Sequence, residues 1–303
     1  MAIIECVNLT KNYGNAKALK NLSFTIEENT ITGLIGRNGA GKTTLLKLIA
    51  GFIRPTSGDI SVFGKAPFDN LSVTSNTFFT DDIMEFPATF NLIGLLDEGS
   101  KFYPNWDMGL AKGLFDYFGL NPKQYHRNLS KGQKSTFNMI VALSSHCALT
   151  IFDEPTSGMD ASVRKDFYRA LLKDYIQNPR TILLSSHMLS EVEGILENIF
   201  LINNGQKILQ MPLEDLKEMA IGLRGDTNSI NMVTSGKHII HTENLKSNQL
   251  FVAVKNHFTK VDLEKAKLSG VEVVPISTED LCVYLTSKSE GGIDDVFDRA
   301  KII

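Results

Sequence analysis

Short apolar runs separated by turn residues fill the chain up to residue 65. The segments IIECVNLT and LSFTIEE alternate or run apolar, and ITGLIG then ends in a glycine-rich turn. In TTLLKLIAGF, the residues Leu45, Leu48 and Ile49 follow the i, i+3, i+4 spacing of a helix. RPTSGDISVFG is typical of a turn followed by a strand. The pattern predicts strands joined by turns, with one helix that follows a buried strand through a glycine-rich turn.

The stretch from about residue 83 to residue 145 has a different texture, rich in aromatic side chains. Within it, Ala111, Leu114, Phe115 and Phe118 lie at i, i+3, i+4 and i+7, the spacing of an amphipathic helix. We expect a helical subdomain here, with most of its aromatic side chains used for packing.

Strands and helices alternate in the next part of the chain. ALTIFDEP is typical of a buried strand, ASVRKDFYRALLKDYI of a helix, TILLSSH of a strand and LSEVEGILE of a helix. NIFLINNGQKILQ then predicts a hairpin around Asn204 and Gly205. Such alternation predicts a mostly parallel sheet with helices packed on it.

Beyond about residue 215 the pattern predicts a small α+β appendage at 225–303. Gly222, Gly225 and residues 226–229 resemble a linker, and the apolar run around INMVT resembles a strand. HIIHTENLKSNQLFVAV predicts a hairpin, VDLEKAKL a helix, VEVVPI a strand and STEDLCVYLTSK a capped helix.

The composition and charge of the chain argue against some classes of function. The chain has 303 residues, of which 43% are hydrophobic, and a formal net charge of −3. This charge gives no electrostatic reason to expect nucleic acid as the main partner. No stretch approaches the ~18 uncharged apolar residues of a membrane span, and the first residues do not resemble a secretory signal.

The segment GRNGAGKT, residues 36–43, matches the pattern G-x-x-x-x-G-K-[ST] between a predicted strand and a predicted helix. Glycines let successive backbone N–H groups point at phosphate oxygens, and the helix N-terminus adds its dipole. Lys42 supplies a cation for the β- and γ-phosphates, and Thr43 a hydroxyl for Mg²⁺. The predicted nucleotide contacts are Gly36, Arg37, Asn38, Gly39, Ala40, Gly41, Lys42, Thr43 and Thr44.

An apolar strand, LTIF, ends in two carboxylates, Asp153 and Glu154. Beside a phosphate-binding loop, a strand-end aspartate can hold Mg²⁺ directly or through water, which makes Asp153 a predicted metal ligand with Thr43. Glu154 can orient or deprotonate the attacking water. The alternative for each is a charged strand end at the surface.

Taken together, these motifs resemble the ATP-binding subunit of an ABC transporter, most like the export ATPases of bacterial drug and peptide systems. LSKGQ (129–133) resembles the signature motif LSGGQ, 157–160 resembles the D-loop, and His187 resembles the switch histidine. The resemblance covers roughly residues 1–215. It implies an α/β P-loop ATPase domain at 1–215, with a mixed sheet core, an antiparallel β subdomain and a helical subdomain at about 83–145.

The resemblance also implies roles for particular residues. Ser130, Lys131, Gly132 and Gln133 would meet the γ-phosphate of an ATP held by a second chain. Lys42, Glu154 and His187 would be the catalytic residues. Tyr13 would stack on adenine, with ordinary packing as its alternative. Asp160 would act at a dimer interface, with a helix N-cap as its alternative or second role.

Two positions depart from the family pattern. Where members carry a glutamine that reaches Mg²⁺, TFFTDD places Asp81, which is a predicted metal ligand through its carboxylate, either directly or through water. Lys131 replaces the first glycine of the signature and adds a cation beside the phosphates.

The implied function is an ATP- and Mg²⁺-dependent subunit that powers a separate membrane-spanning permease, as a homodimer or as a heterodimer with a similar ATPase. It would be cytoplasmic, peripheral on the inner face of the cell membrane through the permease. The missing glutamine, the LSKGQ signature and the TEDL tail resemble those of ATPases from bacterial export systems, and this resemblance implies export of a drug, peptide or similar amphipathic substrate. The alternatives are an importer ATPase, a soluble ABC-type ATPase acting on the ribosome or DNA, and a regulatory member with weak hydrolysis.

Overall fold

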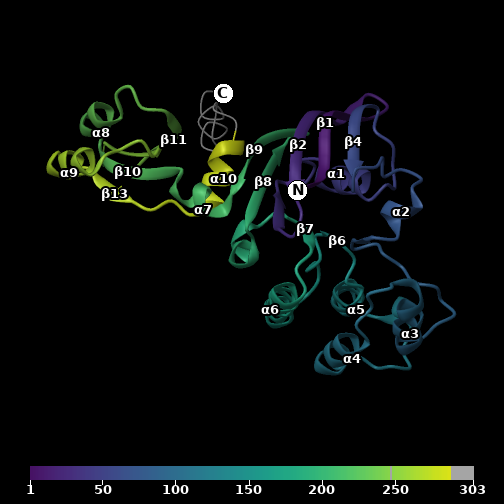
Figure 1. Cartoon of the computed structure of the whole chain (residues 1–303). Helices are drawn as coiled ribbons and strands as arrows, with labels where there is room; N and C mark the ends of the chain where they lie inside the picture. Colours follow the sequence, from purple (N-terminus) through teal and green to yellow (C-terminus); the bar gives the residue numbers. More distant parts are fainter. Residues whose placement is uncertain (246–247, 288–303) are drawn as a thin grey trace, which may run out of the picture. The chain divides into compact units, whose positions relative to one another are not determined.

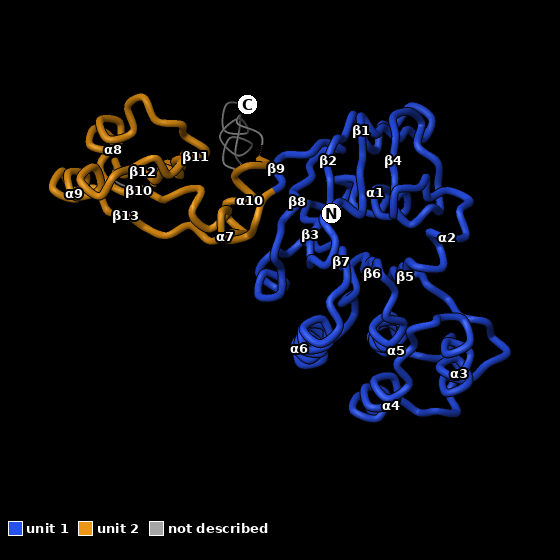
Figure 2. Tube along the Cα trace, in the orientation of Figure 1, with its two compact units in different colours: residues 1–210 blue, residues 211–303 orange. Residues whose placement is uncertain are grey.

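The computed structural model describes residues 1–245 and 248–287 (Figure 1). The chain divides into two compact units, residues 1–210 and 211–303 (Figure 2). Each unit has its own sheets and helices, and each is described by itself.

The first unit contains most of the secondary structure. Its strands are β1 (Ala2–Tyr13), β2 (Ala16–Glu27), β3 (Ile31–Ile35), β4 (Ser57–Val62), β5 (Thr77–Thr80), β6 (Leu149–Asp153), β7 (Thr181–Ser186), β8 (Asn198–Asn203) and β9 (Gln206–Pro212), the last crossing the unit boundary. Its helices are α1 (Lys42–Ile49), α2 (Leu71–Thr74), α3 (Leu92–Phe102), α4 (Met108–Tyr117), α5 (Lys131–Ser144) and α6 (Ala161–Gln177), with short 3-10 turns η1 (His126–Asn128), η2 (Leu189–Glu191) and η3 (Glu193–Ile195).

A six-stranded sheet with the order β5-β6-β7-β3-β8-β9 lies at the centre of this unit. The pairs β5/β6, β6/β7, β7/β3 and β3/β8 are parallel. The carboxyl ends of parallel strands lie at one edge of the sheet, which is where ligands bind in open α/β folds. The loop after β3, the acids after β6 and the histidine after β7 are therefore brought to the same edge.

A second, antiparallel sheet has the order β2-β1-β4. It shares a hydrophobic core with α1 and the central sheet, in which Leu45, Leu48 and Ile49 are buried as the helical spacing predicted. Phe24 of β2 meets Phe200 of β8 edge to face, with ring centroids 4.8 Å apart. The mixed sheet and the antiparallel sheet confirm the predicted fold class.

Helices α3, α4 and α5 lie together (Figure 1): α4 contacts both α3 and α5, and α5 contacts β5. The predicted amphipathic helix is α4, which buries Ala111 and Phe115. Gly99 lets the ring of Trp106 pack closely against α3, because a Cβ at position 99 would lie 2.6 Å from that ring. Phe115 is buried and Phe86, Tyr103, Trp106 and Phe118 are partly buried, which fits the expected packing role, whereas Phe90, Phe102 and Tyr117 are exposed.

The segment LSEVEGILE is not an α-helix, so that prediction was wrong. Residues 189–195 form the two 3-10 turns η2 and η3, with i→i+3 bonds such as the one from Val192 N to Leu189 O. The segment is short and contains Gly194, which disfavours an α-helix by about 1 kcal/mol relative to alanine.

The second unit contains β10 (Ala220–Asp226), β11 (Ile239–Asn244), β12 (Gln249–Lys255) and β13 (Glu272–Val274), with helices α7 (Leu213–Glu218), α8 (Thr227–Thr234), α9 (Lys260–Leu268) and α10 (Thr278–Thr286). From β10 to β13 the chain order is βαββαβ, and the antiparallel sheet has the order β11-β12-β10-β13. This is the ferredoxin-like arrangement. Its core joins Leu223, Ile230, Val252 and Ala266.

Two expectations in this unit were wrong. The glycines assigned to a linker lie inside β10, where a Cβ on Gly222 would come within 2.6 Å of Val274 and 2.8 Å of Phe251. They reflect close packing rather than chain flexibility. The run around INMVT is part of helix α8, which Asp226 caps through bonds from the N–H groups of Asn228 and Ser229.

Candidate active site

The glycine-rich loop between β3 and α1 encloses a cavity of about 290 Å³. Gly39 and Gly41 have φ angles of 80° and 108°, a region that other residues rarely adopt. A Cβ on Gly41 would also lie 2.8 Å from Ala18 O. The cavity is lined by Ala18, Asn38, Gly39, Ala40, Gly41, Lys42, Thr43, Thr44 and Glu154. Much of the predicted phosphate-binding loop therefore lies around one space, together with the carboxylate of Glu154.

Lys42 is buried at the floor of this cavity, with 4% of its side chain exposed. Its ammonium donates to Gly36 O at 2.7 Å and to Arg37 O at 3.4 Å. It also lies 3.2 Å from Glu154 Oε1. A buried cation needs a compensating charge, and Glu154 supplies it here.

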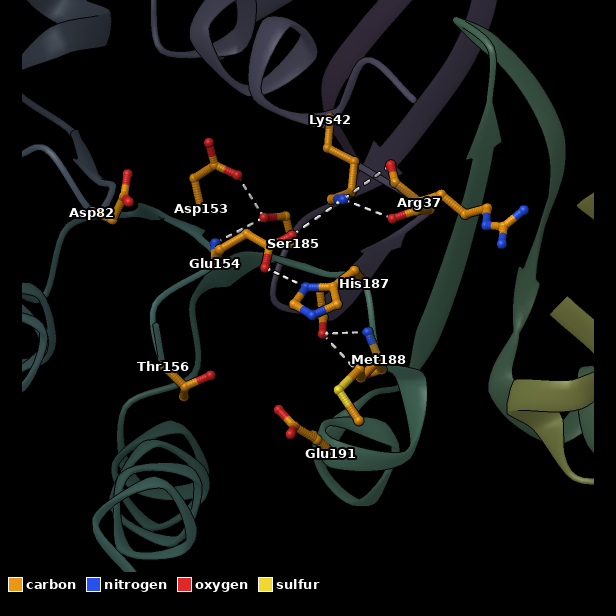
Figure 3. Close-up of polar contacts among 12 residues, drawn as sticks. Arg37, Lys42, Asp82, Asp153, Glu154, Thr156, Ser185, His187, Met188 and Glu191 are labelled. Carbon is orange, nitrogen blue, oxygen red and sulfur yellow. Dashed lines mark hydrogen bonds and ion pairs between the residues drawn. The ribbon is translucent and has the colours of Figure 1, made fainter. Parts of the chain in front are cut away.

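Glu154 and His187 meet at the edge of the cavity (Figure 3). His187 Nδ1 lies 2.6 Å from Glu154 Oε2, so the imidazole donates to the carboxylate. Glu154 adopts a φ of 50°, uncommon for a residue with a side chain. This turn directs the carboxylate toward Lys42 and His187. Two residues that follow separate strands, β6 and β7, are thus in direct contact.

Asp153 is the last residue of β6, and 5% of it is exposed. Its Oδ1 accepts a hydrogen bond of 2.6 Å from Ser185 Oγ. The same hydroxyl accepts from Glu154 N–H at 2.9 Å. Ser185 is not among the site residues that the sequence predicts. The available signal was a serine directly after the apolar run TILL, but its partners depend on the β6–β7 register.

The donors near the loop fit Mg²⁺. Asp153 and Thr43 offer carboxylate and hydroxyl oxygens, and Mg²⁺ at nucleotide sites takes one or two protein oxygens together with phosphate oxygens. Within the described residues there is no group of three or more His, Cys, Asp or Glu side chains suited to a metal. The pair Asp153 and Thr43 is the donor set expected for a Mg²⁺ ion that binds together with a nucleotide.

Asp81 lies just past β5, close to α1. Lys47 Nζ is 3.7 Å from Asp81 Oδ2, and 11% of the Asp81 side chain is exposed. Burial raises the pKa of the Asp81 carboxyl; the charge of Lys47 opposes this, and Asp153 and Asp82 reinforce it. Asp81 therefore lies in the electrostatic field of Asp153, while its direct ionic partner is Lys47.

The signature residues form the start of α5. Ser130 caps this helix in a capping box with Gln133, so the capping role is present. A Cβ on Gly132 would lie 2.5 Å from Gly158 O, and Ser135 Oγ donates to Ser157 O at 2.8 Å. The signature helix therefore packs directly on the loop that follows Glu154. No residue from 130 to 133 is among the described residues that line the P-loop cavity.

Tyr13 and Asp160 also lie outside the cavity lining, as do Gly36, Arg37, Asp81, Asp153 and His187. Tyr13 ends β1 with 51% of its surface exposed, and Lys11 Nζ lies 5.1 Å from its ring centroid. Asp160 caps α6 by accepting from the N–H groups of Ser162 and Val163, both at 2.9 Å. The N-cap alternative for Asp160 is therefore observed.

A P-loop at a parallel sheet edge, with a buried lysine and strand-end acids, defines a nucleoside triphosphate-binding protein of the α/β class. A model of the family "ABC transporter" matches residues 19–157. The ABC transporter ATP-binding protein YtrB of Bacillus subtilis is 31% identical over 73% of this chain and 76% of its own length. The chain belongs to the ATP-binding subunits of ABC transporters, a family that binds and hydrolyses ATP.

Other relatives differ in the transport that their names describe. The bacitracin transport ATP-binding protein BcrA of Bacillus licheniformis is 30% identical over 71% of this chain and 72% of its own. The Nod factor export ATP-binding protein I of Rhizobium meliloti is 27% identical over 94% of this chain and 88% of its own. The aliphatic sulfonates import ATP-binding protein SsuB of Pseudomonas fluorescens is 30% identical over 68% of this chain and 76% of its own length.

Solved structures agree with the fold. The ATP-binding subunit of an ABC transporter superposes with a TM-score of 0.63 at 23% identity, covering 71% of this chain and 92% of that one. A dimeric bacterial cassette, MJ0796, superposes with a TM-score of 0.61 at 20% identity, covering 69% and 98%.

Proposed function

We propose that this chain hydrolyses ATP to power export of a drug, peptide or similar amphipathic compound through a separate membrane-spanning permease. The observation that carries the ATPase part is the Glu154 carboxylate, which contacts Lys42 and His187 at the P-loop cavity. No helix in the described part of the chain has the length and apolar character of a membrane span. The permease is therefore proposed as a separate partner that holds the subunit at the inner face of the membrane.

Different residues of the site bind the phosphates, hold the metal and activate the attacking water. The loop at 36–44 holds the phosphates through its backbone N–H groups, and Lys42 balances their charge. Thr43 and Asp153 hold Mg²⁺, which neutralises charge on the phosphates when bound. Asp81 is proposed as a further metal contact, either directly or through water. Glu154 accepts the proton of the attacking water, and His187 orients Glu154 and contacts the γ-phosphate.

The Lys42–Glu154 contact has a consequence for nucleotide entry. The γ-phosphate carries negative charge and needs the same ammonium that Glu154 contacts at 3.2 Å. Nucleotide binding therefore transfers Lys42 from the carboxylate to the phosphate. The freed Glu154 keeps its bond with His187 and is available to a water molecule.

We also propose that the active form is a dimer, made of two copies of this chain or of this chain and a similar ATPase. The signature residues 130–133 line no part of the described P-loop cavity, so they would complete the site of the facing chain. Ser130, Lys131, Gly132 and Gln133 would contact the γ-phosphate from there, with the α5 N-terminus, and Asp160 would lie at the interface. Tyr13 would stack on the adenine.

Export is favoured by how far the similarity extends. The match to the Nod factor exporter covers 94% of the chain, including the second unit, whereas the match to the importer SsuB covers 68%. We propose an ATPase domain at 1–215, with its helical subdomain at about 83–145, and an accessory domain at 225–303. The compact units differ from these bounds, because α7 and the whole of β10 belong to the second unit.

The test is to co-purify the permease from native membranes and reconstitute the complex with its ATPase facing outward. Bacitracin, supplied outside with Mg²⁺ and ATP, is the first amphipathic probe. Export activity would accumulate the probe inside the vesicles, whereas ATP-driven release of preloaded probe would show import. A complex with ribosomes or DNA and no permease would contradict the transport function.

A further inference from the structure

Ser185 places one hydroxyl between the two acidic residues of the active site. It is fully buried on β7, and it is not part of any motif that the proposed function uses. Its Oγ donates to Asp153 Oδ1 at 2.6 Å and accepts from Glu154 N–H at 2.9 Å (Figure 3). One hydroxyl therefore fixes both the side chain of Asp153 and the backbone of Glu154.

The strand register brings this hydroxyl into place. In the parallel pair β6/β7, Asp153 lies directly opposite Ser185. The next residue, Ser186, cannot substitute, because its hydroxyl donates to Met188 O and accepts from Met188 N–H beyond the strand. The two adjacent serines thus have different functions.

The bond to Asp153 divides the carboxylate into two different oxygens. Oδ1 is used by Ser185, while Oδ2 has no hydrogen bond from any described residue. A carboxylate held through one oxygen presents the other in a fixed direction. Hydrogen-bonded supports of this kind orient metal-binding carboxylates, and losing one typically costs about 10- to 100-fold in metal affinity or activity.

The bond to Glu154 supports an unusual backbone. Its φ of 50° is one that a residue with a side chain adopts at a cost of about 1–3 kcal/mol, unless surrounding contacts hold it. The N–H at this turn is bonded to Ser185, and the same turn directs the carboxylate to Lys42 and His187.

We infer that Ser185 is a positioning residue for ATP hydrolysis: it orients Asp153 toward Mg²⁺ and holds Glu154 in the conformation that meets the attacking water. This inference rests on the proposed roles of Asp153 and Glu154. Its distinctive expectation is a change in the Mg²⁺ dependence of nucleotide binding, because Ser185 acts through a metal-binding carboxylate.

Ser185→Thr and Ser185→Val form a matched pair, since their side chains have nearly the same shape and only threonine keeps the hydroxyl. The affinity of the purified full-length chain for ATP would be measured in EDTA and across a Mg²⁺ series. We expect equal affinities in EDTA. We expect the Val variant to need at least about 10-fold more Mg²⁺ than the Thr variant to reach the same ATP affinity. This is the size of loss typical when a hydrogen bond that orients a metal ligand is removed.

Steady-state ATP hydrolysis of the same variants gives a second measurement. The Val variant should lose about 10- to 100-fold in kcat relative to Thr, with little change in KM for ATP at saturating Mg²⁺. Equal Mg²⁺ dependence in the two variants would overturn the inference. Weaker ATP binding by Val in EDTA would also overturn it, since the serine would then support the fold rather than the metal ligand.

The proposed function is tested separately by Glu154→Gln. Undiminished hydrolysis by that variant would refute the role of Glu154. The Mg²⁺ comparison between Thr and Val would still decide whether Ser185 orients Asp153.

Discussion

Lys131 Nζ lies 3.4 Å from Asp82 Oδ2, which joins the first residue of α5 to the segment that leaves β5. Both side chains are about half exposed, at 58% and 48%. Exposed ion pairs of this kind contribute only about 0.2–1 kcal/mol. Lys131 can therefore leave Asp82 for a stronger anion, such as a phosphate, at a small energetic cost.

We predict that Lys131→Gln weakens ATP-driven dimerisation about 3- to 10-fold at low salt. The lost interaction is a charge-assisted contact with the γ-phosphate, and such contacts are screened by ions. Light scattering with ATP, in the Glu154→Gln background that prevents hydrolysis, would measure dimerisation across a salt series. Lys134→Gln, three residues later on α5, is the control. Identical salt dependence in both variants would exclude a phosphate role for Lys131.

Glu154→Gln should lower ATP hydrolysis by about 100-fold or more, within the range that general-base catalysis supplies. ATP binding should persist, because the phosphate loop and Lys42 remain intact. Phosphate release gives the rate, and light scattering with ATP should show more dimer than in the wild type. Glu5→Gln, at an exposed carboxylate of β1, is the control.

Gly132→Ala should destabilise the first unit by about 1–3 kcal/mol, because the added methyl group would meet Gly158 O at 2.5 Å. Gly113→Ala on α4 is the matched control: nothing lies within 4 Å of its Cβ position, and alanine favours the helix by about 1 kcal/mol. Urea unfolding followed by the fluorescence of Trp106, the single tryptophan, reports on this unit. Equal stability of the two variants would contradict the close contact.

Asp174→Asn should destabilise the first unit by about 3–5 kcal/mol at pH 7, since it leaves the buried Arg180 unpaired. Arg180 Nη2 lies 2.7 Å from Asp174 Oδ2, and His146 Nε2 donates to Oδ1 at 2.9 Å. Asp116→Asn, at an exposed carboxylate of α4, should change stability by less than about 0.5 kcal/mol.

The pH dependence of this difference follows from the Asp174 pKa. Burial alone would raise it, but the His146 hydrogen bond and the Arg180 charge outweigh burial and lower the pKa below its usual value. The resulting stabilisation is present above the unfolded pKa of about 3.9 and is lost as pH falls through the folded value. Urea midpoints from pH 7 to pH 3 should therefore converge for the wild type and Asp174→Asn. A gap that widens toward low pH would contradict this sign.

The sequence predicted local features that depend on spacing along the chain. The loop at 36–44, the acids Asp153 and Glu154, and the Ser130 cap all follow short patterns with a direct physical reason. The role of Ser185 could not be predicted, because its partners depend on which residues of β6 and β7 lie opposite each other. The prediction for Gly222 and Gly225 was wrong for a related reason. Alone they resemble a linker, and only their neighbours in the fold, Val274 and Phe251 at Gly222 and Gly270 and Val271 at Gly225, explain the glycines in this strand.

The close contact between Gly132 and Gly158 joins the signature helix to the short loop between Glu154 and Asp160. Five residues, 155–159, separate Glu154 from Asp160, and the signature helix packs directly on them. In the proposed dimer, Glu154 serves the ATP of its own chain while Ser130 and Lys131 contact the ATP of the facing chain. Hydrolysis at one nucleotide would then shift the signature residues that contact the other nucleotide. The two sites would therefore hydrolyse ATP in a coordinated order rather than independently.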